Sequence, residues 1–158
     1  IMNEMIEIER KFLVIGNPPH VHGVKMVQGY LCKDPERTVR IRIEGEVEQG
    51  RAVLTVKGKP EGIARPEYEY DIPVADAREL MGLCVGSIVE KTRYCHHIGA
   101  HVWEVDVFEG GNHGLIVAEI ELSDPSESFE KPDWIGGEVS SDPRYANSSL
   151  SRKPYSQW

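Results

Sequence analysis

Charged side chains recur two residues apart along much of this chain, and apolar residues fill the positions between them. Glu7, Glu9 and Lys11, for example, alternate with Ile6 and Ile8. Successive residues of a β-strand point to opposite faces of the sheet, so residues two apart share a face. The pattern therefore predicts strands with one charged face and one apolar face.

Eight stretches have this alternation or are rich in β-branched and aromatic residues, and glycines separate most of them as turns. Residues 75–83 have the composition of a short helix, and after Leu122 the chain is rich in Pro, Ser and Asp, with helical turns predicted near 133–139 and 146–152. We thus expect a mainly β, antiparallel domain with a few peripheral helices, and closure into a barrel would remove its exposed edges. The predicted strands are 4–14, 23–32, 37–44, 51–58, 65–72, 88–98, 101–109 and 115–122.

Length and composition fit one globular domain over residues 1–158, with strands to about 122 and a helical tail over 123–158. No apolar run is long enough to span a membrane, and the start of the chain lacks the pattern of a secretory signal. A formal net charge of −8 argues against general nucleic-acid binding. We expect Cys32, Cys84 and Cys95 to be small buried residues in a reducing compartment, the cytoplasm.

Two interpretations of the charged face differ in where it points. A solvated outer face explains alternation by itself, but like charges on one strand then lie only about 7 Å apart, at about 3.3 Å per residue, and repel. If the face points into a closed barrel, a polyanion bridged to divalent cations would satisfy both its signs. The outer apolar face must then be covered by the helical segments or by a partner subunit, so a homodimer is one expectation. The charges in question are the cations Lys11, Arg40, Arg42, Lys57, Arg65, Lys91 and Arg93, and the anions Glu7, Glu9, Glu67, Glu69, Glu104, Asp106, Glu119 and Glu121.

The first strand carries Glu7-Ile8-Glu9-Arg10-Lys11, which fits an E-x-E-x-K signature. In order after it come Arg40-Ile41-Arg42, Lys57, Arg65-Pro66-Glu67-Tyr68-Glu69, Glu90-Lys91-Thr92-Arg93, Glu104-Val105-Asp106 and Glu119-Ile120-Glu121. The set resembles the CYTH, or triphosphate tunnel metalloenzyme, superfamily over residues 4–122. The tail from Asp142 to Leu150 is similar to that of short bacterial members.

The resemblance implies an eight-stranded antiparallel tunnel, a divalent metal (Mg²⁺ or Mn²⁺) and a small-molecule substrate that carries a triphosphate. It implies that Lys11, Arg40, Arg42, Lys57, Lys91 and Arg93 bind phosphates, together with Arg65, which matches less well because Pro66 can disturb the strand. The metal ligands are expected among Glu7, Glu9, Glu104, Asp106, Glu119 and Glu121. We assign catalytic roles to Lys11, Tyr30, Glu67 and Glu69.

Three details complete these expectations. Tyr30 lies near the first strand and could hydrogen-bond Lys11 across the tunnel. Lys153 could reach the tunnel from a C-terminal helix. The six histidines are expected at the surface or in satisfied positions, and no Ser/His/Asp or Cys/His arrangement supports a covalent intermediate.

Several functions remain open at this point. We favour hydrolysis of inorganic tripolyphosphate, because the chain length and the tail match the short bacterial triphosphatases. A class IV-like adenylate cyclase, a thiamine triphosphatase and a non-catalytic polyphosphate-binding domain are the alternatives. Four pairs of acidic residues argue against the last, since an anion sensor does not need them.

Overall fold

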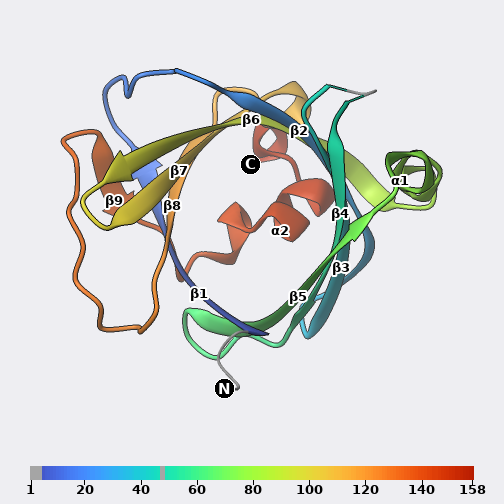
Figure 1. Ribbon diagram of the computed structural model, residues 1–158, viewed down its shortest axis with the longest axis horizontal. Coiled ribbons are helices and arrows are strands. Elements are labelled where there is room, and N and C mark those ends of the chain that lie inside the picture. Colours follow the sequence, from blue (N-terminus) through green and yellow to red (C-terminus); the bar gives the residue numbers. More distant parts are fainter. Residues whose placement is uncertain (1–4, 47–48) are drawn as a thin grey trace.

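The computed structural model describes residues 5–46 and 49–158, and its eight principal strands close into an antiparallel barrel (Figure 1). Around the barrel the order is β1-β5-β4-β3-β2-β6-β7-β8, and β8 pairs with β1. The ring closes where Ile6, Glu7 and Ile8 of β1 pair with Pro66, Arg65 and Ala64 of β5. The strands are β1 (Ile6–Val14), β2 (Val24–Asp34), β3 (Arg37–Glu44), β4 (Arg51–Gly58), β5 (Ala64–Ile72), β6 (Val85–Ile98), β7 (His101–Phe108) and β8 (Ile116–Glu121).

The predicted barrel is confirmed, and so are two of the three predicted helical segments. These two are α1 (Val74–Met81) and α2 (Asn147–Arg152). Short 3₁₀ turns lie at η2 (Gly110–Asn112), η3 (Pro143–Tyr145) and η4 (Tyr155–Gln157).

The helical turn predicted near 133–139 is wrong, because this segment forms a ninth strand, β9 (Ile135–Glu138). The pairing of β5 with β1 ends at Ile8, so that the second half of β1 has an open edge on that side. The new strand fills this edge by pairing with Phe12 and Val14. Two consecutive glycines, Gly136 and Gly137, also make the segment a poor helix former.

The apolar outer face of the barrel is covered largely by the chain itself. Helix α1 packs Ala77 against Ile41 and Ala52 of β3 and β4. On the other side, the segment between β8 and β9 lays Phe129 against Trp103 with ring centroids 5.6 Å apart. Some apolar side chains remain uncovered, among them Tyr68 and Tyr70 on the outside of β5.

One end of the barrel interior is apolar and is closed by α2, which Figure 1 shows inside the ring of strands. Leu150 of α2 is fully buried against Val89, Phe108, Leu115 and Val117. Val89, Phe108 and Val117 belong to the same strand faces as Lys91, Asp106 and Glu119, which lie two residues away on each strand. The inward face is therefore charged along only part of its length.

The expectation of buried cysteines is wrong. Cys95 is exposed, and Cys32 and Cys84 are half-buried; all three are free thiols. Cys95 pairs with Glu104 and lies two residues beyond Arg93, so it belongs to the inner strand face, where the barrel opens. In the described ranges, no helix combines the length and the apolar character needed to cross a bilayer.

Replacing Leu150 by Ala should lower the free energy of unfolding by about 2–5 kcal/mol, because the change leaves a cavity between α2 and the barrel. Urea denaturation would measure the loss. Leu83→Ala is the matched control, since Leu83 is 68% exposed and its truncation should change stability by less than about 0.5 kcal/mol. Equal, small effects of both variants would contradict the docking of α2.

Candidate functional site

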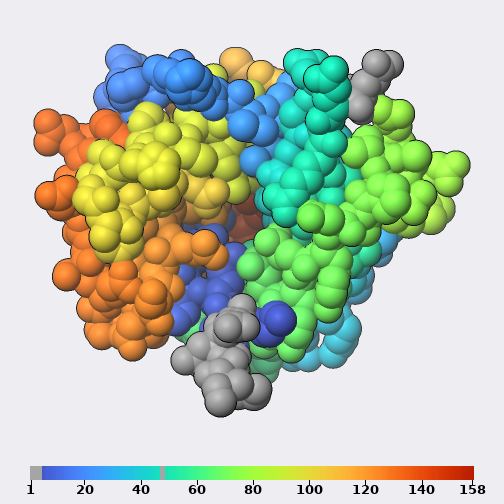
Figure 2. Space-filling view, viewed as in Figure 1, coloured from blue at the N-terminus to red at the C-terminus, as the bar shows by residue number. Residues whose placement is uncertain are grey.

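The barrel encloses a cavity of about 620 Å³, and Figure 2 shows its open mouth between the strand ends. All but one of the side chains assigned a site role from the sequence line this cavity; the exception is Asp106. The lining members of that set are Glu7, Glu9, Lys11, Tyr30, Arg40, Arg42, Lys57, Arg65, Glu67, Glu69, Lys91, Arg93, Glu104, Glu119 and Glu121. None of the six histidines lines it.

Three carboxylates from non-consecutive strands meet on one side of the cavity. We call this side, with Glu7, Glu9, Glu67, Glu119 and Glu121, the acidic wall. Glu7 of β1, Glu67 of β5 and Glu121 of β8 each place one oxygen so that all three oxygens lie within 4.8 Å of one another. The closure of the barrel brings them together, because β1 pairs with β5 on one side and with β8 on the other. Carboxylate oxygens at this spacing are suitable ligands for Mg²⁺ or Mn²⁺.

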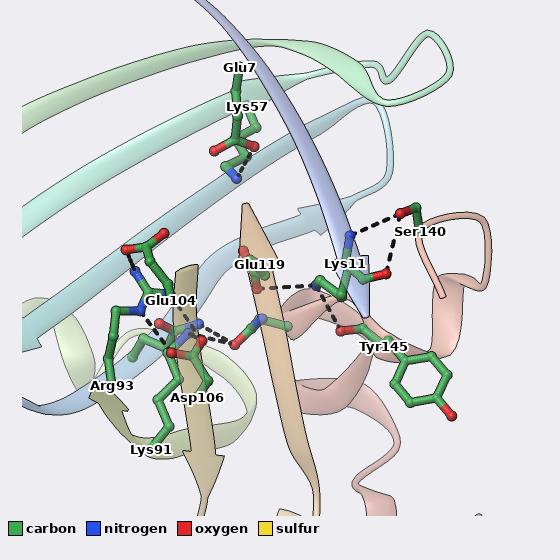
Figure 3. Close-up of polar contacts among 12 residues, drawn as sticks. Glu7, Lys11, Lys57, Lys91, Arg93, Glu104, Asp106, Glu119, Ser140 and Tyr145 are labelled. Carbon is green, nitrogen blue, oxygen red and sulfur yellow. Dashed lines mark hydrogen bonds and ion pairs between the residues drawn. The ribbon is translucent and has the colours of Figure 1, made fainter. Parts of the chain in front are cut away.

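The charges of Glu7 and Glu67 depend on each other and on Lys57, whose Nζ lies 2.8 Å from Glu7 and 3.4 Å from Glu67 (Figure 3 draws the first contact). Burial and a hydrogen bond with Glu7 raise the pKa of Glu67 to about 8. Burial acts to raise the pKa of Glu7 as well, but Lys57 and the hydrogen bond with Glu67 outweigh it, and that pKa is lowered. The two carboxyl groups therefore share a proton when no cation is bound, and a divalent cation could replace it.

A second carboxyl pair lies next to the first. Burial and the nearby Glu119 raise the pKa of Glu9 well above its usual range. For Glu119 the effect of burial is outweighed by Lys11, whose Nζ lies 3.5 Å away, and its pKa is well below the usual range. The Lys11 ammonium donates its hydrogen bond to the carbonyl of Tyr145 at 3.1 Å, and within the described residues none joins it to Tyr30. Tyr30 is buried and lines the cavity.

Asp106 lies behind the wall, fully buried, where two cations hold it (Figure 3). Its oxygens accept from Arg93 Nε at 2.7 Å and Nη2 at 2.9 Å, and Lys91 Nζ lies 2.8 Å away. Arg93 also donates to Glu104 at 2.9 Å. Although Asp106 opposes the effect, burial lowers the pKa of Lys91 to about 8. Asp106 thus fixes the positions of Lys91 and Arg93, two of the cationic side chains that line the cavity.

The opposite wall carries Arg40 and Arg42 of β3. Arg40 donates to Thr55 at 3.0 Å and lies 3.5 Å from Glu69, and Arg42 lies 3.5 Å from Glu44. The Nε atoms of both arginines are buried without a hydrogen-bond partner. Burial and the neighbouring Arg40 lower the pKa of Arg42. Two adjacent guanidinium groups with unused donors favour the binding of an anion.

Arg65 lies at the edge of the cavity, and Lys153, which was expected to reach the tunnel, is not among the residues that line it. Arg65 lines the cavity but donates through Nε and Nη2 to the carbonyl of Gly58, so its guanidinium is tied to the β4–β5 connection. The adjacent Pro66 pairs with Ile6, and the pairing of β5 with β4 starts only at Glu67. Lys153 is exposed at the end of α2.

Sequence reasoning missed a neutral polar part of the cavity wall. Ser140 accepts a hydrogen bond from the backbone of Lys11, and Asn147 contacts Lys91. Gln28, fully buried on β2, donates to Asn147. For Asn147 the only signal was the similarity of the tail from Asp142 to Leu150 to short bacterial chains. Ser140 and Gln28 had no signal, because single serines and amides have no periodic pattern.

A sequence model of the CYTH domain matches residues 5–155. The chain belongs to the CYTH domain family. It is 47% identical to the inorganic triphosphatase of Acetivibrio thermocellus, with 94% of this chain and 95% of the relative covered. It is 36% identical to the inorganic triphosphatase of Nitrosomonas europaea, with 93% and 97% covered. A crystal structure of an inorganic triphosphatase superposes with a TM-score of 0.64 at 35% identity, over 92% of this chain and 93% of the other.

Replacing Glu67 by Gln should stabilise the metal-free protein, and more so at high pH. An acid whose pKa is higher in the folded state than in the unfolded chain costs stability as the pH rises from about 4.5 to about 8. Gln does not titrate, so the gain in melting temperature over the parent protein should be larger at pH 9 than at pH 5 in the presence of a chelator. Glu61→Gln, in the exposed turn before β5, is the control. An equal gain at both pH values would contradict the shared proton.

Proposed function

We propose that this CYTH protein hydrolyses inorganic tripolyphosphate with the aid of Mg²⁺ or Mn²⁺. One observation carries the proposal: a single cavity joins a wall with three closely spaced carboxylates to a wall of buried arginines and lysines. The names of the two curated relatives, both inorganic triphosphatases that match almost the whole chain, support the same activity.

Glu7, Glu67 and Glu121 would hold the divalent cation, with Glu9 and Glu119 next to them on the same wall. The shared protons of these carboxyl pairs support this assignment, because like charges crowded in a buried wall need a cation or a proton between them. A metal bound there would supply positive charge to the phosphate oxygens and would lower the pKa of a bound water.

The cationic side chains would bind the phosphate chain at successive positions. Arg40 and Arg42 have unused Nε donors, and Asp106 sets the orientation of Lys91 and Arg93. Lys57 lies between the two walls and contacts Glu7. Because these groups come from β3, β4 and β6, a triphosphate can contact more of them than a pyrophosphate can. Arg65 would bind a phosphate at the edge of the cavity.

The remaining polar groups would act on the reacting phosphate and on the attacking water. Glu69 would orient the attacking water, and the Thr55 hydroxyl holds Glu69 by donating to its Oε2 at 3.0 Å. Glu67, as a ligand of the cation, would bring that water next to the metal. Lys11 would neutralise charge on the leaving phosphate. Tyr30, buried and lining the cavity, would donate to a phosphate oxygen and so limit the site to a small linear substrate.

We also propose a cytoplasmic location and a homodimer. Three free thiols fit a reducing compartment. The exposed Tyr68 and Tyr70 on β5 are the apolar side chains that a second subunit would cover.

Phosphate release from tripolyphosphate, pyrophosphate, ATP and thiamine triphosphate, each with Mg²⁺ or Mn²⁺, tests the proposed function. Tripolyphosphate should be the best substrate, and a chelator should abolish its hydrolysis until the metal is added back. Undiminished hydrolysis in chelator would refute the metal requirement, and cyclic AMP formed from ATP would favour the cyclase alternative.

Arg42→Ala should lower the kcat/KM for tripolyphosphate by about 10- to 150-fold, because a charge-assisted hydrogen bond contributes roughly 1.5–3 kcal/mol. Its melting temperature should stay close to that of the parent, since the Nε of Arg42 has no partner to lose and Arg40 repels it. Arg51→Ala is the matched control: Arg51 is exposed and pairs with Asp71 outside the cavity lining. Equal kinetics of both variants would argue against a phosphate contact by Arg42.

A further inference from the structure

The segment just before and at the start of α2 makes hydrogen bonds with two lysines of the tunnel. The carbonyl of Tyr145 accepts from Lys11 Nζ at 3.1 Å, as Figure 3 shows. The side-chain Oδ1 of Asn147 accepts from Lys91 Nζ at 3.1 Å and from Gln28 Nε2 at 3.0 Å. Lys11 belongs to β1 and Lys91 to β6, two strands that are not neighbours in the barrel. The tail therefore contacts the cationic groups directly, besides covering the end of the barrel.

The ammonium group of Lys91 determines the orientation of both amides. An ammonium can only donate, so Asn147 must turn its oxygen, and not its NH₂ group, towards Lys91. Gln28 must then present its own NH₂ group to the same oxygen. Its Oε1 consequently remains buried without a partner, in a side chain that is fully buried. An unpaired buried acceptor is unfavourable, and here it is the consequence of keeping the Asn147 carbonyl on Lys91.

The position of the Lys91 ammonium depends on its two oxygen partners. One N–H points to Asp106 Oδ2 at 2.8 Å and one to Asn147 Oδ1, which leaves the third of its three donors for the cavity that Lys91 lines. The side chain of Lys91 is only 1% exposed, so its approach to a substrate must be well defined. If Asn147 lost its carbonyl, Asp106 would hold the ammonium alone and could draw it back from the cavity.

We propose that Asn147 is a positioning residue for triphosphate binding, which directs the third donor of Lys91 towards the phosphate chain. The proposal rests on the proposed function and deepens it, because it makes the C-terminal tail part of the substrate site. If the proposal holds, replacing Asn147 weakens substrate binding only when Lys91 is present. If Asn147 merely anchors α2, its replacement has the same effect with or without Lys91.

A double-mutant cycle tests this dependence. Asn147→Ala, Lys91→Ala and the double variant are compared by steady-state kinetics on tripolyphosphate and by calorimetric titration with tripolyphosphate in metal-free buffer. Asn147→Ala should raise KM and Kd by about 10-fold, the equivalent of one weakened charged contact, and should change kcat by less than about 3-fold. In the Lys91→Ala background, the same substitution should change KM and Kd by less than about 2-fold.

Two controls separate this effect from loss of stability. Phe129→Leu weakens the packing of the outer segment between β8 and β9 on Trp103, outside the cavity lining, and should leave KM unchanged. Asn147→Ser replaces the amide by a shorter hydroxyl and serves in the same cycle if Asn147→Ala does not fold. An unchanged KM in Asn147→Ala, or an equal effect with and without Lys91, would overturn the proposal. A parent protein that neither cleaves nor binds tripolyphosphate would instead refute the proposed function.

Discussion

The burial of many ionisable groups inside a closed barrel is the constraint on which the rest of this structure depends. Carboxylates and ammonium groups lose hydration there, and only opposite charges at short range can compensate. Lys57 lies 2.8 Å from Glu7, and Asp106 is enclosed by Lys91 and Arg93. In the neighbouring carboxyl pairs, Glu7 with Glu67 and Glu9 with Glu119, the nearby lysine favours the charge of one member, and the pKa of the other is raised. Most interior charges are thus compensated by an opposite charge nearby, while the Nε donors of Arg40 and Arg42 remain unused.

Small barrels usually have apolar side chains inside and polar ones outside, and in this barrel the two faces are exchanged. The segments outside the eight strands have roles that result from this exchange. The outer apolar face needs cover, which α1 gives to β3 and β4, and which the segment with Phe129 gives to Trp103. The strand β9 completes the edge that β5 leaves open on β1. At one end the interior becomes apolar, and Leu150 anchors α2 there. Helix α1, the segment with Phe129 and β9 thus cover apolar surface or complete a strand edge, and the tail with α2 also contacts Lys11 and Lys91 inside the barrel.

The alternation of residue types was sufficient to predict the strands and which side chains share a face, because it depends only on the two-residue repeat of a strand. The closed tunnel with the charged face inside followed from the resemblance of the motifs to the CYTH superfamily. The alternation could not predict which charges meet, since that depends on the register between strands distant in sequence. Glu67 was thus expected to act in catalysis apart from the metal ligands, yet it lies with Glu7 and Glu121. Asp106 follows the same alternation but lies behind two cations. Asn147 belongs to no repeat at all, so only the folded tail shows its contact with Lys91.

The positions of the strands explain why one barrel can gather carboxylates on one side and arginines with unused donors on another. The grouped carboxylates come from β1, β5 and β8, which are adjacent around the closure, whereas the arginines with unused donors come from β3. Closure on β1 brings the acidic strands together, while β4 separates β5 from β3, so Arg40 and Arg42 cannot all be matched by this carboxylate group. Arg40 and Arg42 therefore keep unused Nε donors, although each also lies 3.5 Å from a carboxylate, Glu69 and Glu44 respectively. A metal-bound triphosphate, which presents a cation next to phosphate oxygens, is the kind of ligand that suits both sides of the cavity.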